Sequence, residues 1–73
     1  MDRKSTKLYR FGRNLHNARK LKGLTQEELA EKVDLTREHI AKVEVGIRGV
    51  SINTLFKIAE VLDVPEKELF DFK

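Results

Sequence analysis

The sequence has no cysteine, no tryptophan, a single proline and no long run of apolar residues. Without cysteine the chain can form neither a disulfide nor a thiolate metal site, which suits a reducing compartment. Its apolar stretches fall far short of the ~20 residues that cross a bilayer. Its charged N-terminus lacks a hydrophobic signal segment. We therefore expect a cytoplasmic protein that does not enter a membrane.

Groups that could carry catalysis or hold a metal are also scarce. The two histidines, His16 and His39, are far apart, and no acidic residue has a recognisable metal-ligand spacing to either. The 73 residues make one domain, which leaves no second domain for a small-molecule ligand. We expect no enzymatic activity, no metal, no cofactor and no small-molecule ligand.

The charges are unevenly distributed along the chain, although the formal net charge is only +3. Residues 1–22 carry eight basic side chains against Asp2 alone, which gives +7. Residues 23–49 carry four basic and six acidic side chains, and residues 50–73 carry three and five, so each segment has a charge of −2. A basic front end indicates a polyanionic partner approached from one side. A solvated helix face would explain the same charge run.

The apolar spacing predicts a single all-α domain of about five short helices, with no strand. Residues 1–7 lack apolar periodicity and are predicted to form a basic flexible arm, which leaves 8–73 as the domain. A helix is predicted over residues 8–21, and Gly12 inside it permits close packing. Its apolar stripe is predicted to contain Leu8, Phe11, Leu15, Ala18 and Leu21 or Lys22.

Gly23 is a natural stop for the first helix, and Gly46 for the third. Ser51 is predicted to cap a fourth helix, and Pro65 to begin a short fifth one. The apolar face of the fourth helix is predicted to consist of Ile52, Leu55, Ile58, Ala59 and Leu62.

The stretch from Thr25 to Glu44 has the pattern of two short helices separated by a tight turn. Thr25 can cap the first of them, and Glu28 stands where it completes a capping box. Thr36 can cap the second helix. This pattern predicts a helix-turn-helix.

The second helix of this pair would turn Ile40 and Val43 inward and a polar face outward. The polar face lies near the helix's N-terminal end, as in helix-turn-helix units that insert this end into the major groove. We expect its base-reading residues to be Thr36, Arg37, Glu38 and Lys42.

The chemistry of these side chains fits the edges of the bases. Arg37 can donate to guanine O6 and N7, Glu38 can accept from the cytosine amino group, and the methyl group of Thr36 can touch that of thymine. Gln26 and Arg48 are candidate contacts to DNA phosphates. Taken singly, each of these residues is more often a solvated surface side chain than a DNA contact, so the prediction depends on the whole set.

Three segments resemble the xenobiotic-response-element family, the helix-turn-helix class of phage Cro and repressor proteins. They are Gly-Leu-Thr-Gln-Glu-Glu-Leu-Ala-Glu-Lys-Val at 23–33, Ile-Ala-Lys-Val-Glu at 40–44 and Leu-Phe-Lys-Ile-Ala-Glu-Val-Leu-Asp-Val-Pro at 55–65. The resemblance covers roughly residues 11–70. It implies a five-helix Cro/repressor-type domain that regulates transcription as a homodimer on a palindromic operator in double-stranded DNA.

The small size and Arg48-Gly49-Val50-Ser51 also resemble, more weakly, the controller proteins of restriction–modification systems. By position, the family resemblance implies a phosphate contact for Gln26 and base reading for the outward residues already named. It also implies a structural ion pair between Arg19 and Glu44. Asp34 departs from the family, which usually has glycine in the turn between the two central helices.

The surface for dimerisation is predicted from apolar residues near the C-terminal end. A core this small cannot hold all of them, so we expect the dimer interface to include Phe56, Val61, Phe70 and Phe72. Leu69 is expected to close the core. An alternative is an antitoxin-type helix-turn-helix protein, in which the same apolar residues would bind a toxin partner.

Overall fold

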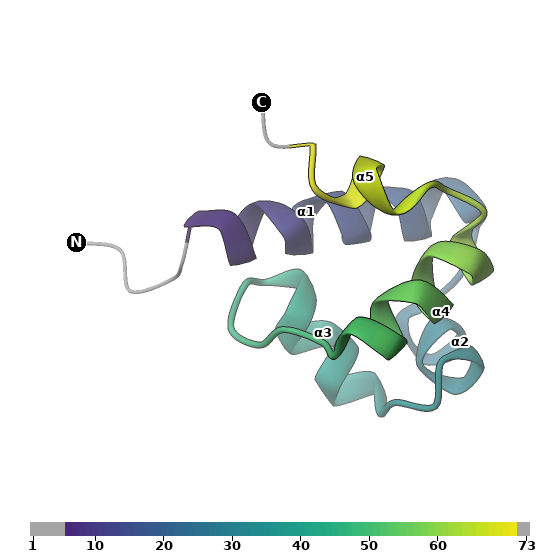
Figure 1. Ribbon diagram of the computed structural model, residues 1–73. Coiled ribbons are helices and arrows are strands. Elements are labelled where there is room, and N and C mark those ends of the chain that lie inside the picture. Colours follow the sequence, from purple (N-terminus) through teal and green to yellow (C-terminus); the bar gives the residue numbers. More distant parts are fainter. Residues whose placement is uncertain (1–5, 72–73) are drawn as a thin grey trace.

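The computed structural model describes residues 6–71, which form five α-helices and no strand (Figure 1). The helices are α1 (Thr6–Lys22), α2 (Gln26–Lys32), α3 (Arg37–Glu44), α4 (Ile52–Leu62) and α5 (Glu66–Leu69). Helix α1 runs along one side of the molecule with α5 beside it, and α2, α3 and α4 lie on the other side (Figure 1). The predicted all-α, five-helix fold is confirmed. No helix within residues 6–71 has the length and apolar character of a membrane span.

Helix α1 begins two residues before the predicted start at residue 8. Thr6 and Lys7, which the sequence predicts to lie in the arm, therefore belong to α1. The rest of the predicted arm, residues 1–5, lies outside the described residues. Toward the other end of the chain, Pro65 lies at the position just before the first residue of α5, Glu66, rather than being that first residue.

The polar residues predicted to start the central helices do so. The Glu28 N–H donates to Thr25 Oγ1 at 3.0 Å, and the Thr25 N–H donates back to Glu28 Oε1 at 2.9 Å, which completes the capping box of α2. The hydroxyl of Thr36 accepts from the N–H of His39 at 3.0 Å. Ser51 caps α4 in the same way. These caps satisfy backbone donors that have no partner inside the helix.

Four helices are followed by a residue in the left-handed backbone region, where glycine is least strained. Gly23 and Gly46 have φ values of 80° and 83°, as their predicted roles as helix stops require. Asp34 and Asp63 adopt the same region with φ values of 62° and 58°. At Asp34 this conformation turns the chain between α2 and α3, at the position where the resemblance implies glycine. A residue with a side chain adopts it at a cost of roughly 1–2 kcal/mol.

The core lies where the five helices meet. The following apolar side chains are buried: Phe11, Leu15, Leu29, Ala30, Val33, Ile40, Val43, Leu55, Ile58, Ala59, Leu62 and Leu69. Two predicted core positions are wrong, because Leu21 is 90% exposed and Ile52 is 64% exposed. Arg19, one helical turn after Leu15, takes the inward position near the end of α1. Ile52 lies in the first turn of α4, which borders an open groove.

Gly12 allows α1 to cross directly over the C-terminal end of α3. A Cβ atom at Gly12 would lie 2.2 Å from the carbonyl oxygen of Val43 and 2.8 Å from that of Glu44. Both distances are shorter than any van der Waals contact, and both involve backbone atoms that cannot turn away. Glycine in the middle of α1 therefore sets the distance between α1 and α3.

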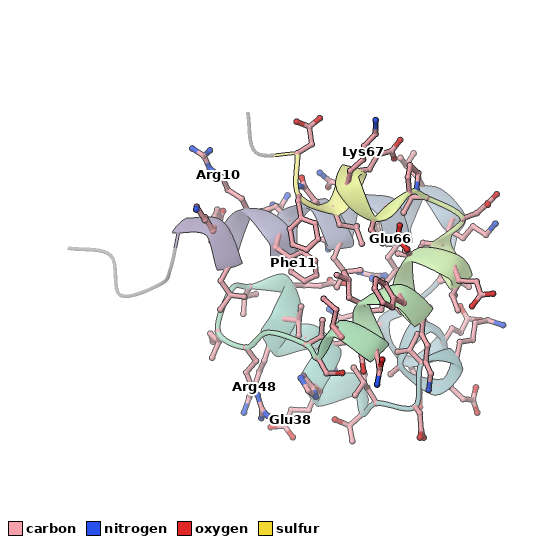
Figure 2. All side chains as sticks on the ribbon, in the orientation of Figure 1. Arg10, Phe11, Glu38, Arg48, Glu66 and Lys67 are labelled. Atoms are coloured by element: carbon pink, nitrogen blue, oxygen red, sulfur yellow. The ribbon has the colours of Figure 1, made fainter. Side chains whose placement is uncertain are left out.

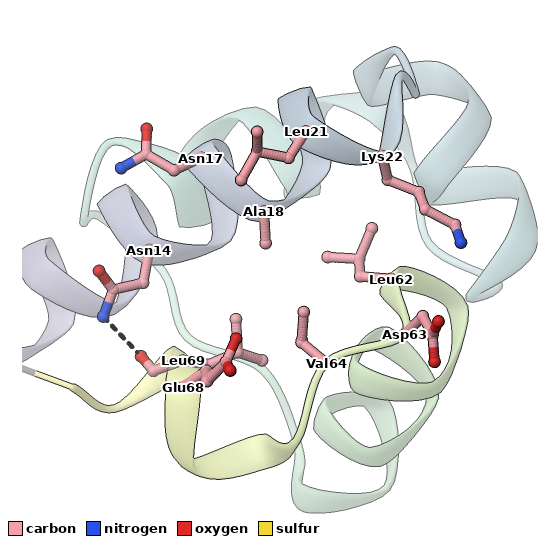
Figure 3. A pocket seen from close by; sticks show the side chains of 10 residues that line it. All are labelled: Asn14, Asn17, Ala18, Leu21, Lys22, Leu62, Asp63, Val64, Glu68 and Leu69. Carbon is pink, nitrogen blue, oxygen red and sulfur yellow. Dashed lines mark hydrogen bonds between the residues drawn. The ribbon is translucent and has the colours of Figure 1, made fainter.

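Helix α5 is tied to α1 by polar and aromatic contacts. The side-chain amide of Asn14 donates to the carbonyl oxygen of Leu69 at 3.0 Å (Figure 3). The ring of Phe70 stacks on Phe11 with 5.4 Å between the ring centroids. Leu69 itself is buried and closes the core, as predicted. A pocket of about 380 Å³ remains between α1, the end of α4 and α5 (Figure 3).

Candidate nucleic-acid interface

Helix α3 is held from two sides and exposed on the third. Ile40 and Val43 are fully buried against the core, because α3 packs against both α1 and α2. Thr36, Arg37 and Glu38 are exposed at the N-terminal end of α3. The structure thus gathers these three predicted base-reading residues at one exposed end of a short, fixed helix.

The fourth predicted base-reading residue, Lys42, lies one turn further along α3. Its side chain is 42% exposed, and its Nζ lies 3.4 Å from Glu38 Oε2. Exposed ion pairs of this kind contribute little to stability, because water competes for both charges. The pair leaves both side chains available to an outside partner.

Arg48, one of the two candidate phosphate contacts, is exposed in the loop between α3 and α4. Figure 2 shows Glu38 and Arg48 extending outward on the side of the molecule opposite α5. Arg10 and Lys67 extend outward on the side of α1 and α5 (Figure 2). The charged residues at the α3 end therefore form a surface separate from that of Arg10.

Gln26, the other candidate phosphate contact, touches two residues of α3. Its Nε2 donates to Glu44 Oε1 at 3.0 Å, and its Oε1 lies 3.5 Å from Arg37 Nη1. No sequence pattern predicts this contact between Gln26 and Arg37, the two predicted DNA-binding side chains.

Arg19 and Glu44 form the buried ion pair that the resemblance implied. Arg19 Nε donates to Glu44 Oε2 at 2.6 Å, and Arg19 Nη2 donates to Glu44 Oε1 at 3.1 Å. Arg19 Nη1 donates to the carbonyl oxygen of Leu24 at 2.7 Å, at the turn into α2. Both side chains are less than 10% exposed. The pair connects α1 to the C-terminal end of α3.

His16 is a further member of this cluster that sequence reasoning missed. Its Nδ1 lies 2.9 Å from Glu44 Oε1. The only available signal was its spacing of three residues from Arg19, which places both side chains on the same side of a helix. Burial alone would raise the pKa of Glu44, but the hydrogen bonds that it accepts and the charge of Arg19 lower the pKa below its ordinary value of 4.5.

The predicted dimer residues differ in their surroundings. Phe56 is 52% exposed, and Phe70 remains 47% exposed despite stacking on Phe11. Val61 is half-buried and packs against the core, and Phe72 lies outside the described residues. Ile52, which was predicted to be buried, lines a groove of about 480 Å³ together with Phe70.

Within residues 6–71 no group of His, Asp and Glu side chains is arranged to hold a metal ion. His39 instead contacts the backbone, with its Nε2 3.1 Å from the carbonyl oxygen of Gly49. In the described part of the chain, every buried side-chain nitrogen and oxygen has a hydrogen-bond partner. The buried polar side chains beneath α3 therefore all have partners within the protein.

Residues 15–69 match the helix-turn-helix family HTH_3. The chain belongs to this family. It is 40% identical over 63 residues to the control protein C.BamHI of Bacillus amyloliquefaciens, an alignment that covers 85% of this chain and 78% of that protein. The resemblance found in the sequence is thereby confirmed.

Two solved structures have the same arrangement of helices. The restriction–modification controller protein C.AhdI from Aeromonas hydrophila matches with a TM-score of 0.84 and 41% identity, over 90% of this chain and all of that one. SinR, a master regulator for biofilm formation solved in complex with DNA, matches with a TM-score of 0.77 and 34% identity, over 84% of this chain and 98% of that one. This helix-turn-helix protein is a DNA-binding regulator of transcription.

Proposed function

We propose that this regulator binds a palindromic operator as a homodimer and inserts α3 of each copy into the major groove. The observation that carries the proposal is the exposed N-terminal end of α3, with Thr36, Arg37 and Glu38 on a helix whose other side is buried. Helix-turn-helix proteins present this end of their second helix to the base edges. Because the buried side of α3 packs against the protein core, the helix holds these exposed side chains in a constant position.

Each outward side chain of α3 has a role that its chemistry suits. Arg37 donates to O6 and N7 of a guanine, and Glu38 accepts from the amino group of a cytosine. Thr36 offers a methyl group to a thymine, and Lys42 reaches a base or a phosphate once it leaves Glu38. The weak ion pair between Glu38 and Lys42 is easily exchanged for such contacts.

Gln26 and Arg48 contact the DNA backbone on either side of α3. Arg48 is exposed on the same side of the molecule as Glu38, which supports a phosphate contact beside the base-reading residues (Figure 2). Gln26 has a second amide hydrogen that remains available after the first is donated to Glu44. Such contacts fix the register of a protein on DNA without reading its sequence.

A homodimer follows from the size of the reading helix. The eight residues of α3 span about 12 Å, which covers only a few base pairs. A symmetric dimer doubles the contacts and reads an inverted repeat.

We assign the dimer contact to an apolar face of Ile52, Phe56 and Phe70. Ile52 and Phe56 are one turn apart on α4, and Ile52 and Phe70 line the same groove, which supports one continuous surface. Val61 contributes less, because it already packs against the core.

The regulated genes are those of a restriction–modification system. This finer assignment is supported by the similarity to C.BamHI and C.AhdI, each aligned over most of its own length. An antitoxin role, the alternative raised by the sequence, finds no support in these relatives.

Selection of bound sequences from random double-stranded DNA tests the proposal. The expected result is an inverted repeat whose half-sites lie about 10 base pairs apart, or a multiple of that distance. Enrichment of a single half-site would contradict the palindromic operator, and no enrichment would contradict specific binding. Placing the recovered operator upstream of a reporter gene then tests regulation.

Sedimentation at micromolar protein concentration tests the dimer. Ile52→Lys should shift the protein toward the monomer, whereas Asn53→Lys, a neighbouring exposed position, should not. A monomer in the unchanged protein would rule out a preformed homodimer.

A further inference from the structure

The outer side of α1 carries a row of basic side chains that the proposed function does not use. Helix α1 contains six basic residues and no acidic one. Leu15 points into the core, and at 3.6 residues per turn four exposed residues lie on the side of the helix opposite to it. These four residues, which we call the α1 row, are Arg10, Arg13, Asn17 and Lys20. The row places three positive charges along about 15 Å of helix.

The charges of the α1 row have no partner in the described part of the protein. Arg19, the basic residue beside them, is buried against Glu44. By contrast, Arg10, Arg13 and Lys20 form no ion pair or side-chain hydrogen bond with any other residue between 6 and 71. Like charges one turn apart on a helix repel each other. The stability of α1 therefore does not explain the row.

The α1 row also lies away from the surface that is proposed to read the operator. Gly12 packs against α3, and Arg10, two residues earlier, lies about 160° from it around the helix. Figure 2 shows Arg10 extending away from the side that carries Glu38 and Arg48. The molecule extends at least 22 Å in each direction, which is more than two Debye lengths of about 8 Å at physiological salt. Arg10 therefore adds little attraction for DNA that is bound at α3.

The chemistry of the α1 row suits phosphate groups better than a protein surface. The centre of a protein–protein interface is depleted of charge, whereas the row contains no apolar residue. A DNA duplex presents one negative charge per about 1.7 Å of its axis, so a row of this length meets several phosphates on any sequence. Arginine binds phosphate through two parallel hydrogen bonds, and the amide of Asn17 can donate to a phosphate as well.

We propose that the α1 row is a second, sequence-independent DNA-binding surface, through which the operator-bound protein holds a separate segment of duplex DNA. This inference goes beyond the proposed function, in which every DNA contact comes from α2, α3 or the residues that flank α3. A duplex is stiff over about 150 base pairs, so the operator itself does not wrap around to the outer side of α1. The protein then bridges two segments, of which α3 reads one and α1 holds the other.

A two-duplex capture assay tests the bridge. Operator duplex is fixed to beads, saturated with protein and washed, and a fluorescent duplex of random sequence is then added at 50 mM or 200 mM salt. The unchanged protein should capture the second duplex at the lower salt concentration. With three phosphate contacts, the affinity for the second duplex should fall about 40-fold between the two salt concentrations.

Arg10→Gln combined with Arg13→Gln removes two of the three charges, and glutamine keeps the helix propensity of arginine. This row variant should capture the second duplex more weakly, with an affinity that falls only about 4-fold between the same salt concentrations. Lys32→Gln combined with Lys57→Gln is the matched control, because it makes the same change in net charge at exposed positions of α2 and α4. The control should capture the second duplex as the unchanged protein does. Both variants should keep the affinity for the operator, measured by fluorescence anisotropy.

Three outcomes would overturn the second surface. The first is no capture by the unchanged protein at 50 mM salt, or capture of fluorescent polyglutamate in place of the duplex, which would indicate an acidic protein partner. The second is an equal loss of capture in the row variant and the control, which would attribute capture to net charge alone. The third is a loss of operator affinity in the row variant, which would make the row part of the operator-binding surface.

Failure of the proposed function can be distinguished from failure of this inference. If selection from random DNA finds no operator, the proposed function is wrong. The protein itself is then fixed to the beads, and the random-sequence duplex is added to the unchanged protein, the row variant and the control. Weaker binding by the row variant alone would support the α1 row as a DNA-binding surface, and equal binding by all three would overturn it.

Discussion

Helix α3 carries two ion pairs of opposite character. On its inner side, Glu44 meets Arg19 of α1 at 2.6 Å, with both side chains buried. On its outer side, Glu38 meets Lys42 of the same helix at 3.4 Å, with both side chains in contact with water. The inner pair must overcome the loss of hydration, and it does so with additional hydrogen bonds. The outer pair loses little hydration and gains little stability.

This difference shows how one short helix can be held firmly in the fold and still present side chains to an outside partner. Its inner charges are fully used in joining α1, α2 and α3, so they cannot respond to DNA without disturbing the fold. Its outer charges contribute little to stability, so each of them can exchange its present partner for another. Four predictions test this division between the inner and the outer charges of α3.

Replacing Glu44 by alanine should cost about 3–5 kcal/mol of unfolding free energy, because it leaves Arg19 buried without its partner. Urea denaturation measures the loss, and Glu38→Ala is the control on the same helix. Similar losses for the two variants would contradict the distinction between the inner and outer pairs.

Gly12→Ala should destabilise the fold by about 1–3 kcal/mol, even though alanine favours helix formation. The added Cβ would push α1 away from α3 and so stretch the contact between Arg19 and Glu44. Asn17→Ala, at an exposed position of α1, should be neutral or slightly stabilising. Thermal melts compare the two, and a more stable Gly12→Ala variant would show that α1 and α3 are not held at this distance.

Acidification should weaken the inner pair. The pKa of Glu44 is lower in the folded protein than its ordinary value of 4.5, so its contribution to stability is present above that pH and is lost as the pH falls through the folded-state pKa. NMR titration of the Glu44 carboxyl carbon should give a midpoint below 4.5, and urea denaturation at decreasing pH should show the accompanying loss. A midpoint above 4.5 would mean that burial outweighs the hydrogen bonds.

Glu38→Ala should change stability by no more than about 0.5 kcal/mol, and less at high salt. The same substitution should alter the preferred base at one operator position, because Glu38 is proposed to read cytosine. Denaturation measures the change in stability, and operator selection with the same preparation measures the change in the preferred base. A large loss of stability with no change in sequence preference would reverse the roles assigned to the two sides of α3.

Much of the fold could be predicted from residues within four positions of one another. Thr25, Thr36 and Ser51 cap helices because their hydroxyl groups reach backbone N–H groups three residues on. Gly23 and Gly46 end helices because glycine tolerates the left-handed conformation. The outward position of Arg37 and Glu38 followed from the helical period once Ile40 and Val43 were turned inward.

The predictions of burial are wrong where neighbouring helices cover a helix face along only part of its length. A repeating pattern says which residues share a face, but not where the neighbouring helices stop covering it. The spacing of Leu21 predicts a core position, yet Leu21 is exposed at the end of α1. The spacing of Ile52 predicts a core position too, but the first turn of α4, in which Ile52 lies, borders an open groove.

Local sequence patterns are enough to predict where the central helices begin and end and which side chains point away from the core. These features depend on hydrogen bonds and periodicity within a few residues. The carboxylate of Glu44 is instead shared through tertiary packing, because its partners Arg19, His16 and Gln26 are 25, 28 and 18 residues away in the sequence. These contacts depend on the close approach of α1 to α3 at Gly12, and no short-range sequence pattern predicts that approach.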